Sequence, residues 1–167
     1  DGNAEFIKSQ GSYADYYSDY GWFGTLEEID NVSMYKIKNI VDDTIEFTGV
    51  EVDVAETFLD VAEGWNWIGY TPQEILDISV ALSNIPNESA EFIKSQGSYA
   101  DFYSGFGWFG TLDNMEPFNG YLLRMSESAN FVYGTDGMAR TVSFTNNADN
   151  EFDLNIHDYE HNATMTS

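Results

Sequence analysis

One stretch of this chain occurs twice. Residues 4–26 read AEFIKSQGSYADYYSDYGWFGTL, and residues 90–112 read AEFIKSQGSYADFYSGFGWFGTL. The copies are offset by 86 residues (90 minus 4), align without a gap and differ at three positions. A period of this length is too long for a solenoid and indicates a tandem array of small domains. The chain must therefore fold as related units.

The repeat predicts three parts. Residues 1–40 form the hairpin half-unit of a first repeat, residues 41–127 a complete second repeat, and residues 128–167 the start of a following module or an interdomain stub. Because the chain starts inside a repeat, we expect it to be a piece of a longer protein. The two hairpin units should flank the central segment. Either both dock on it, or one finds its missing half in a neighbouring molecule, which would give a homodimer by domain swapping.

Alternation of apolar and polar residues predicts mainly short strands joined by turns. The predicted strands cover residues 5–9, 13–17, 22–26, 34–40, 44–48, 51–54, 57–61, 65–70, 121–125, 131–133 and 140–144, with a hairpin over 93–103. Residues 65–70 (WNWIGY) are apolar and aromatic, as in a buried central strand.

One amphipathic helix is predicted from Pro72 to Ile85. Thr71 suits the N-cap, Pro72 the first helical position, and Glu74 completes a capping box. Apolar residues at helical spacing then form one stripe: Ile75, Ile78, Leu82 and Ile85. The predicted fold class is therefore α+β, with mainly antiparallel repeat units and one helix packed on a sheet.

Charge and cysteine content exclude several classes of protein. The chain has 29 acidic and 6 basic residues, a net charge of −23. Such a surface repels phosphate backbones and anionic lipid, so we expect no nucleic-acid partner and no membrane insertion. The acidity fits a marine habitat and equally an ordinary extracellular protein. Without cysteine, disulfides, thiol catalysis and Cys-ligated zinc are excluded.

Aromatic residues are dense in both copies of the repeat. Tyrosine and tryptophan join a large apolar face to a polar tip, which suits stacking on sugars or burial at a protein interface. Strand alternation places Tyr13 and Tyr17 on one face of the hairpin and Tyr16 on the other, so some aromatics should face away from the core and others pack in it. The candidate ligand-binding residues are Tyr13, Tyr16, Tyr20, Trp22, Tyr99, Phe102, Phe106 and Trp108.

Nothing in the sequence carries a recognisable reaction, and we expect no enzyme activity. His157 and His161 lie four residues apart in the tail, as a metal pair or as two solvated histidines. Calcium is the one cofactor that the sequence suggests, because oxygen ligands alternate at Asn147, Asp149, Glu151 and Asp153. The metal candidates are Asp149, Glu151 and Asp153, although an acid-rich chain produces such alternation by chance.

The order of these pieces resembles a module of secreted, cell-surface proteins from marine bacteria of the Bacteroidetes type. In that module a Gly-Trp-Asn strand precedes a helix, an aromatic hairpin and a Leu-x-x-Leu-x-Pro-Gly-x-Gly-Tyr loop. The matching pieces here are residues 64–69, 72–85, 93–103 and 112–124. The first copy departs from the pattern, with residues 30–34 (DNVSM) where Pro and Gly are expected. Residues 152–160 are similar to the opening of another secreted module.

The resemblance implies an extracellular or cell-surface multidomain protein. Two functions are then open. The first is a non-enzymatic repeat module for adhesion or structural spacing, which contacts an extracellular glycan or protein through its aromatic strips. The second is a carbohydrate-binding appendage of a secreted polysaccharide hydrolase.

Overall fold

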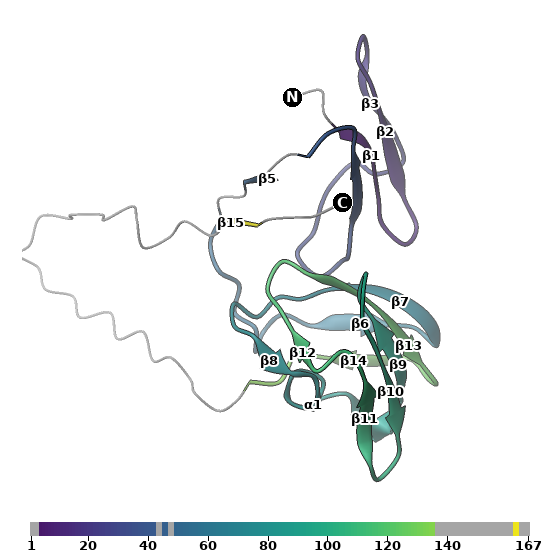
Figure 1. Ribbon diagram of the computed structural model, residues 1–167, viewed down its shortest axis with the longest axis vertical. Coiled ribbons are helices and arrows are strands. Elements are labelled where there is room, and N and C mark those ends of the chain that lie inside the picture. Colours follow the sequence, from purple (N-terminus) through teal and green to yellow (C-terminus); the bar gives the residue numbers. More distant parts are fainter. Residues whose placement is uncertain (1–3, 43–44, 47–48, 136–161, 164–167) are drawn as a thin grey trace, which may run out of the picture.

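Most of the strand residues that the structure describes belong to two antiparallel sheets (Figure 1). The computed structural model describes residues 4–42, 45–46, 49–135 and 162–163. The first sheet has the strand order β3-β2-β1-β4. Its strands are β1 (Ala4–Lys8), β2 (Tyr13–Tyr17), β3 (Gly21–Gly24) and β4 (Lys36–Asn39).

The second sheet has the strand order β11-β10-β9-β13-β7. Its strands are β7 (Gly64–Gly69), β9 (Ala90–Lys94), β10 (Tyr99–Tyr103), β11 (Gly107–Gly110) and β13 (Gly120–Met125). Three short pairs complete the strands: β8 (Leu76–Asp77) with β12 (Asn114–Met115), β6 (Leu59–Val61) with β14 (Ala129–Phe131), and β5 (Ile45–Glu46) with β15 (Asn162–Ala163).

The two copies of the repeat adopt the same local structure. Ile7 pairs with Ile37 in the first sheet, and Ile93 pairs with Leu123, 86 residues further on, in the second. A β-bulge interrupts the pairing of β1 with β4, and another interrupts the pairing of β9 with β13. Equal sequence therefore gives equal strand register in both units.

A close backbone contact explains one glycine in each copy. A Cβ on Gly24 would lie 2.0 Å from the Tyr13 carbonyl oxygen, and a Cβ on Gly110 would lie 2.1 Å from that of Tyr99. No side chain fits at such a distance. Each glycine lets the end of the third strand approach the second.

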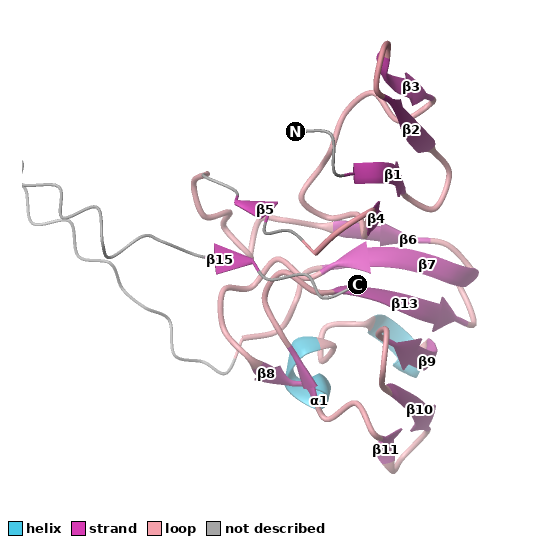
Figure 2. Ribbon diagram, turned by 45° about the horizontal axis from the view of Figure 1, so that its top comes forward, coloured by secondary structure: helices cyan, strands magenta, loops and turns pink. Residues whose placement is uncertain are grey.

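The main core lies on one side of the second sheet. Figure 2 shows β8 and α1, which both contribute to this core, beside the strands of that sheet. Strands β7, β9, β10 and β13 supply one layer, and β6, β8 and the residues from Ile78 to Ile85 cover it, with β14 and Tyr133 at its side. The buried apolar residues of this core are Leu59, Val61, Ile68, Tyr70, Leu76, Ile78, Ala81, Leu82, Ile85, Ala90, Ile93, Ala100, Leu112, Met115, Tyr121, Leu123, Met125, Phe131 and Tyr133. Burial on this scale is the largest favourable contribution to folding.

The predicted helix from Pro72 to Ile85 is wrong in extent. The α-helix α1 covers only Ile78–Ala81, and its N-cap is Asp77, whose carboxylate accepts a hydrogen bond from the Ser79 N–H. A separate 3-10 turn covers Pro86–Glu88. Thr71 is buried and caps nothing.

Pairing with a distant strand explains the short helix. Leu76 pairs with Met115, and Asp77 pairs with Asn114, so the chain is extended where the first helical turns were predicted. The Ile78 N–H donates to the Asp113 carbonyl at 3.0 Å, which fixes the start of α1. Over the described residues the fold is thus mostly antiparallel β with one short α-helix.

A predicted strand at residues 51–54 is also wrong. The Asp53 carboxylate accepts a hydrogen bond from the Ala55 N–H at 3.0 Å, and the Glu56 N–H donates to the Asp53 carbonyl at 3.1 Å. These bonds form a turn, which is a conformation that aspartate favours. The strand predicted at residues 140–144 lies outside the described residues.

The first unit docks on the free edge of β7. The Gly69 N–H donates to the Val32 carbonyl at 2.7 Å, and the Met34 N–H donates to the Trp67 carbonyl at 3.2 Å. Strand β7 therefore lies between β13 and residues 32–34. In this arrangement both hairpin units contact the central segment, the second through β13 and the first through residues 32–34. Domain swapping and the three-part division stay predictions.

The side chain of Gln10 extends this edge contact. Its Nε2 donates to the Trp65 carbonyl, and its Oε1 accepts from the Trp67 N–H, both at 2.8 Å. One amide side chain thus takes the place of a paired residue in a neighbouring strand.

None of the described helices is long and apolar enough to cross a membrane.

Candidate functional site

The outer face of the second sheet, opposite the core, carries a row of aromatic and charged residues. Directly opposed residues cross all five strands in the order Trp65, Arg124, Phe92, Asp101 and Phe109. Neighbouring strands lie about 4.8 Å apart, so the row is roughly 19 Å long. Such a row is long enough to contact several units of an extended ligand.

The rings on this face contact one another and stay open to solvent. Trp65 meets Phe92 edge to face at 5.8 Å between ring centroids, and Phe92 stacks on Tyr99 at 5.9 Å with 14° between the ring planes. Trp65 is 41% exposed and Tyr99 is 48% exposed. Ring contacts of this kind hold the side chains in place and leave their outer surfaces free.

Every basic residue in the described part of the chain lies on an outer sheet face. The five are Lys8, Lys36, Lys38, Lys94 and Arg124, and the sixth basic residue of the chain, Arg140, is outside the described residues. Strand register puts Lys8 opposite both Tyr13 and Lys36, and Lys38 opposite Phe6. In a chain with 29 acidic residues, such a distribution concentrates positive charge in one region.

The cations lie over the aromatic rings. The Lys94 ammonium is 5.2 Å and the Arg124 guanidinium 5.9 Å from the centre of the Trp65 ring. The Lys36 ammonium is 4.6 Å from the centre of the Trp67 ring. Cations at these distances are attracted by the ring quadrupole.

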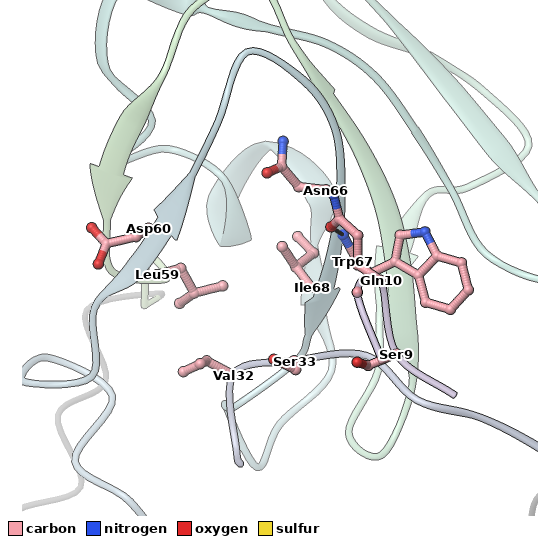
Figure 3. Close-up of a pocket in the computed structure, with 10 residues that line it drawn as sticks. Ser9, Gln10, Val32, Ser33, Leu59, Asp60, Asn66, Trp67 and Ile68 are labelled. Carbon is pink, nitrogen blue, oxygen red and sulfur yellow. Dashed lines mark hydrogen bonds between the residues drawn. The ribbon is translucent and has the colours of Figure 1, made fainter. Parts of the chain in front are cut away.

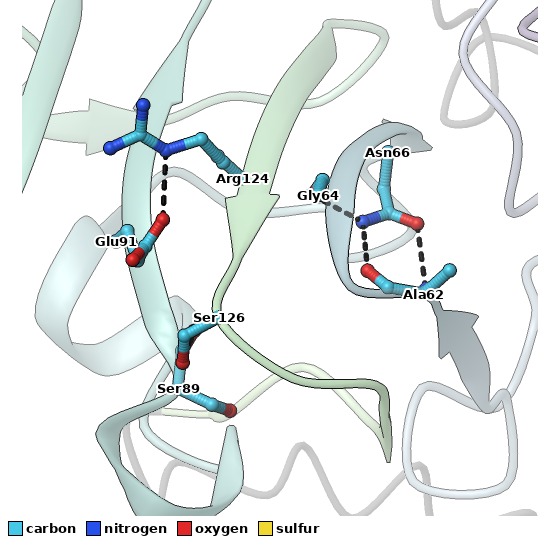
Figure 4. Close-up of polar contacts among 7 residues, drawn as sticks. All are labelled: Ala62, Gly64, Asn66, Ser89, Glu91, Arg124 and Ser126. Carbon is cyan, nitrogen blue, oxygen red and sulfur yellow. Dashed lines mark hydrogen bonds and ion pairs between the residues drawn. The ribbon is translucent and has the colours of Figure 1, made fainter.

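The sheets also provide acidic partners for two of the cations. Arg124 Nε lies 2.9 Å from a carboxylate oxygen of Glu91 (Figure 4), and Lys38 Nζ lies 2.6 Å from one of Glu5. The β-bulge in each unit places the glutamate beside the residue that faces the cation. No such ion pair holds Lys94 within the described residues.

The contact between Lys36 and Trp67 joins the outer faces of the two sheets. We call the combined surface the aromatic–basic face. Its aromatic and basic residues are Phe6, Lys8, Tyr13, Tyr17, Phe23, Lys36, Lys38, Trp65, Trp67, Phe92, Lys94, Tyr99, Tyr103, Phe109 and Arg124, and Asp15, Asp101 and Leu122 lie among them.

The Gly-Trp-Asn motif explains why two tryptophans point outward. Gly64 has a positive φ of 89° and makes the turn into β7. The buried Asn66 amide donates to the Ala62 carbonyl at 2.8 Å and accepts from the Ala62 N–H at 2.9 Å (Figure 4). Because Asn66 is fixed inward, alternation sends Trp65 and Trp67 to the outer face.

The structure divides the eight predicted aromatic residues among three places. Tyr13 and Tyr99 lie on the aromatic–basic face. Four lie on the opposite, inner face as two edge-to-face pairs: Tyr16 with Trp22 at 5.3 Å, and Phe102 with Trp108 at 5.1 Å. Tyr20 and Phe106 lie at the turn tips and are 78% and 81% exposed.

Sequence reasoning missed most of the aromatic–basic face. It named neither Phe92 nor Trp65, although the alternation in AEFIK and GWNWIG contains the signal. Phe92 and Lys94 are two residues apart, as are Trp65 and Trp67, so each pair shares one face. Which strands bring these pairs together depends on β13, which lies between β7 and β9.

A cluster of buried tyrosines belongs to the core. Tyr133 donates its hydroxyl hydrogen to the Gly69 carbonyl at 2.8 Å, and its ring lies 5.0 Å from that of Tyr70. Burial raises the pKa of Tyr133, and likewise that of Tyr70 and of Tyr121. These hydroxyls stay neutral and serve packing.

A small cavity of about 240 Å³ lies where the two units meet (Figure 3). Its lining includes Gln10, Ser33, Asp60, Asn66 and Trp67. The amides of Gln10 and Asn66 already bond to backbone groups beside it. The cavity is therefore part of the junction between the units.

Among the described residues, no three side chains of His, Asp or Glu gather as a metal site would require. The calcium candidates Asp149, Glu151 and Asp153 lie outside the described residues, as do Asn147, His157 and His161. Calcium binding there stays a prediction.

Fold and site together define a class: an antiparallel β-repeat protein whose sheets present an exposed aromatic and basic surface. Comparison with known protein families, with curated proteins and with solved structures finds no match to this chain.

Proposed function

We propose that this protein is a non-enzymatic extracellular module that binds polysaccharide through the aromatic–basic face. The observation that carries the proposal is the open array of Trp65, Phe92 and Tyr99. These residues come from β7, β9 and β10, and the Phe92 ring contacts the other two rings. Flat rings offer the C–H faces of sugar rings a large apolar surface, while tyrosine hydroxyls remain available for hydrogen bonds. A sheet face suits an extended ligand better than a closed cavity does.

The charges on the face favour a sugar chain that bears carboxylate or sulfate groups. Elsewhere the chain is strongly acidic, so an anionic ligand is repelled from most of its surface. Lys94 lies over Trp65 and has no acidic partner at ion-pair distance within the described residues. A carboxylate stacked beside Trp65 would meet that ammonium. Glu91 and Asp101 add oxygen acceptors for sugar hydroxyls.

Binding to defined oligosaccharides tests this proposal. We would titrate the protein with oligogalacturonate and with a neutral galactan oligosaccharide of equal length, and measure the affinity of each by calorimetry. We expect oligogalacturonate to bind more tightly, with an affinity that falls as salt is raised. Trp65→Ala should weaken binding of both sugars about tenfold or more, and Lys94→Gln should weaken only the acidic one.

Ile75→Ala is the matched control, because Ile75 is 62% exposed and does not belong to the aromatic–basic face. Its affinities should equal those of the unchanged protein. The proposal fails if neither sugar binds, or if Trp65→Ala binds both as tightly as the unchanged protein does.

Structural spacing is a second candidate function, and the junction of the two units favours it. Gln10 and residues 32–34 hold the edge of β7 by backbone-directed hydrogen bonds, which orient one unit against the next. Spin labels on the two units should give a narrow distance distribution, and Gln10→Ala should broaden it. A distribution that is already broad in the unchanged protein would argue against a spacer.

A further inference from the structure

The inner faces of the two sheets differ, although the repeat that builds them is nearly the same. Ile93 and Leu123 are each 0% exposed in the second sheet. Their counterparts in the first sheet, Ile7 and Ile37, are only partly buried. Identical strand register in the two units excludes a difference in local structure as the cause. What differs is the layer that covers each sheet.

Residues outside β1, β4, β9 and β13 show the same asymmetry more strongly. Met115 is 0% exposed, whereas Ile29, 86 residues earlier, is 62% exposed. Trp108 packs against the core, whereas Trp22 is 48% exposed. The first unit therefore presents apolar side chains that its counterpart buries.

The second unit shows what covers these side chains. The segment of residues 59–85, which runs through β6, β7, β8 and α1, does this in two ways. Strand β7 extends the sheet beside β13, and the rest of the segment packs over the inner face. The segment's buried apolar residues are Leu59, Val61, Ile68, Tyr70, Leu76, Ile78, Ala81, Leu82 and Ile85. Within it, β7 pairs with β13 over the whole length from Gly120 to Met125.

The first unit has an open edge in the corresponding place. Strand β4 is the counterpart of β13, and it is the edge strand of its sheet among the described residues. An unpaired edge presents N–H and C=O groups that can pair with another strand. The open edge and the open apolar face thus lie where counterparts of β7 and α1 would be.

We propose that the inner face of the first sheet is a docking site for a further strand-and-helix segment. This segment would have the sequence of residues 59–85 and would be supplied by another stretch of polypeptide. Most of the receiving surface matches it, and Asn39 stands where the second unit has the buried Met125. Ile7 and Leu26 are the same residues as Ile93 and Leu112, and Ile37 replaces Leu123 at nearly equal volume. The added strand would extend the sheet at β4, as strand addition does in other proteins.

Stoichiometry argues against a second copy of this chain as the occupant. These 167 residues contain two copies of the hairpin repeat and one segment of residues 59–85. A copy that lends its segment uncovers its own Ile93 and Leu123, so the exchange buries no additional surface. The occupant must bring a segment that does not already cover a hairpin unit.

An extended chain tests this proposal directly. A copy of residues 55–86 placed before Asp1 restores the 86-residue spacing to the first unit. We expect amide hydrogen exchange in β1 and β4 to slow by roughly a hundredfold or more, because the open face becomes part of a core. Ile7→Ala should then destabilise the extended protein as much as Ile93→Ala does.

The control is the same extension with Ile68→Asp and Ile78→Asp in the added copy, which should leave the exchange rates of β1 and β4 unchanged. Two results would overturn the proposal. One is equal exchange in the extended and original chains. The other is a dimer of the original chain, measured by light scattering, in which β1 and β4 are already protected, because a second copy would then be the occupant.

Discussion

The two copies of the repeat allow one substitution to be measured in two environments. Ile93→Ala and Ile7→Ala remove the same three carbon atoms from the same sequence context, AEFIKSQGSYAD. Ile93 is fully buried. Removing its three carbons forfeits about 2.4 kcal/mol of transfer free energy at about 0.8 kcal/mol per methylene. The cavity left in a packed core raises the total to about 3–4 kcal/mol.

Ile7→Ala should cost much less. Ile7 is only partly buried, so less transfer free energy is lost, and an open face leaves no enclosed cavity. We expect a cost of about 1–2 kcal/mol for this substitution. Native-state amide exchange as a function of urea reports the two sheets separately and measures both values. Equal costs would refute the reasoning, because they would mean that the two inner faces are equally covered.

Three further predictions concern the junction, a loop carboxylate and a glycine. Gln10→Ala removes both hydrogen bonds to β7 and should destabilise docking of the first unit by about 1–2 kcal/mol, measured by amide exchange of Trp67. Burial alone would raise the pKa of Asp30, but hydrogen bonds from the 30–35 loop outweigh it and lower the pKa below 3.8. The ionised Asp30 therefore contributes stability above pH 3.8, and this stability is lost as the pH falls through the lowered pKa. When the melting temperature is measured against pH in acid, the part of its decline that is due to Asp30 should be absent in Asp30→Asn. Gly110→Ala should cost about 1–3 kcal/mol in urea unfolding because the new methyl group meets a backbone oxygen, whereas Gly97→Ala, with nothing within 4 Å, should cost far less.

Local sequence signals predicted much of the strand structure. The hairpin of β1 and β2 follows from alternating residues around the Gln10–Gly11 turn, and it returns at β9 and β10. These elements depend on contacts a few residues apart, which a sequence shows directly.

Non-local pairing explains the errors. The helix predicted from Pro72 was plausible on capping and spacing alone, yet Leu76 pairs with Met115, 39 residues later (115 minus 76). The same limit applies to the candidate site. Trp65 and Phe92 meet across β13, and no pattern within either strand states that the strands are two positions apart in the sheet.

The four tryptophans provide a direct test of the proposal that the aromatic–basic face binds polysaccharide. Trp65 and Trp67 belong to the aromatic–basic face, while Trp22 and Trp108 lie on the inner faces. Each indole N–H gives its own signal in a proton–nitrogen correlation spectrum. On addition of oligogalacturonate, we expect the signals of Trp65 and Trp67 to shift and that of Trp108 to stay in place. Shifts confined to Trp22 and Trp108 would contradict polysaccharide binding by the aromatic–basic face.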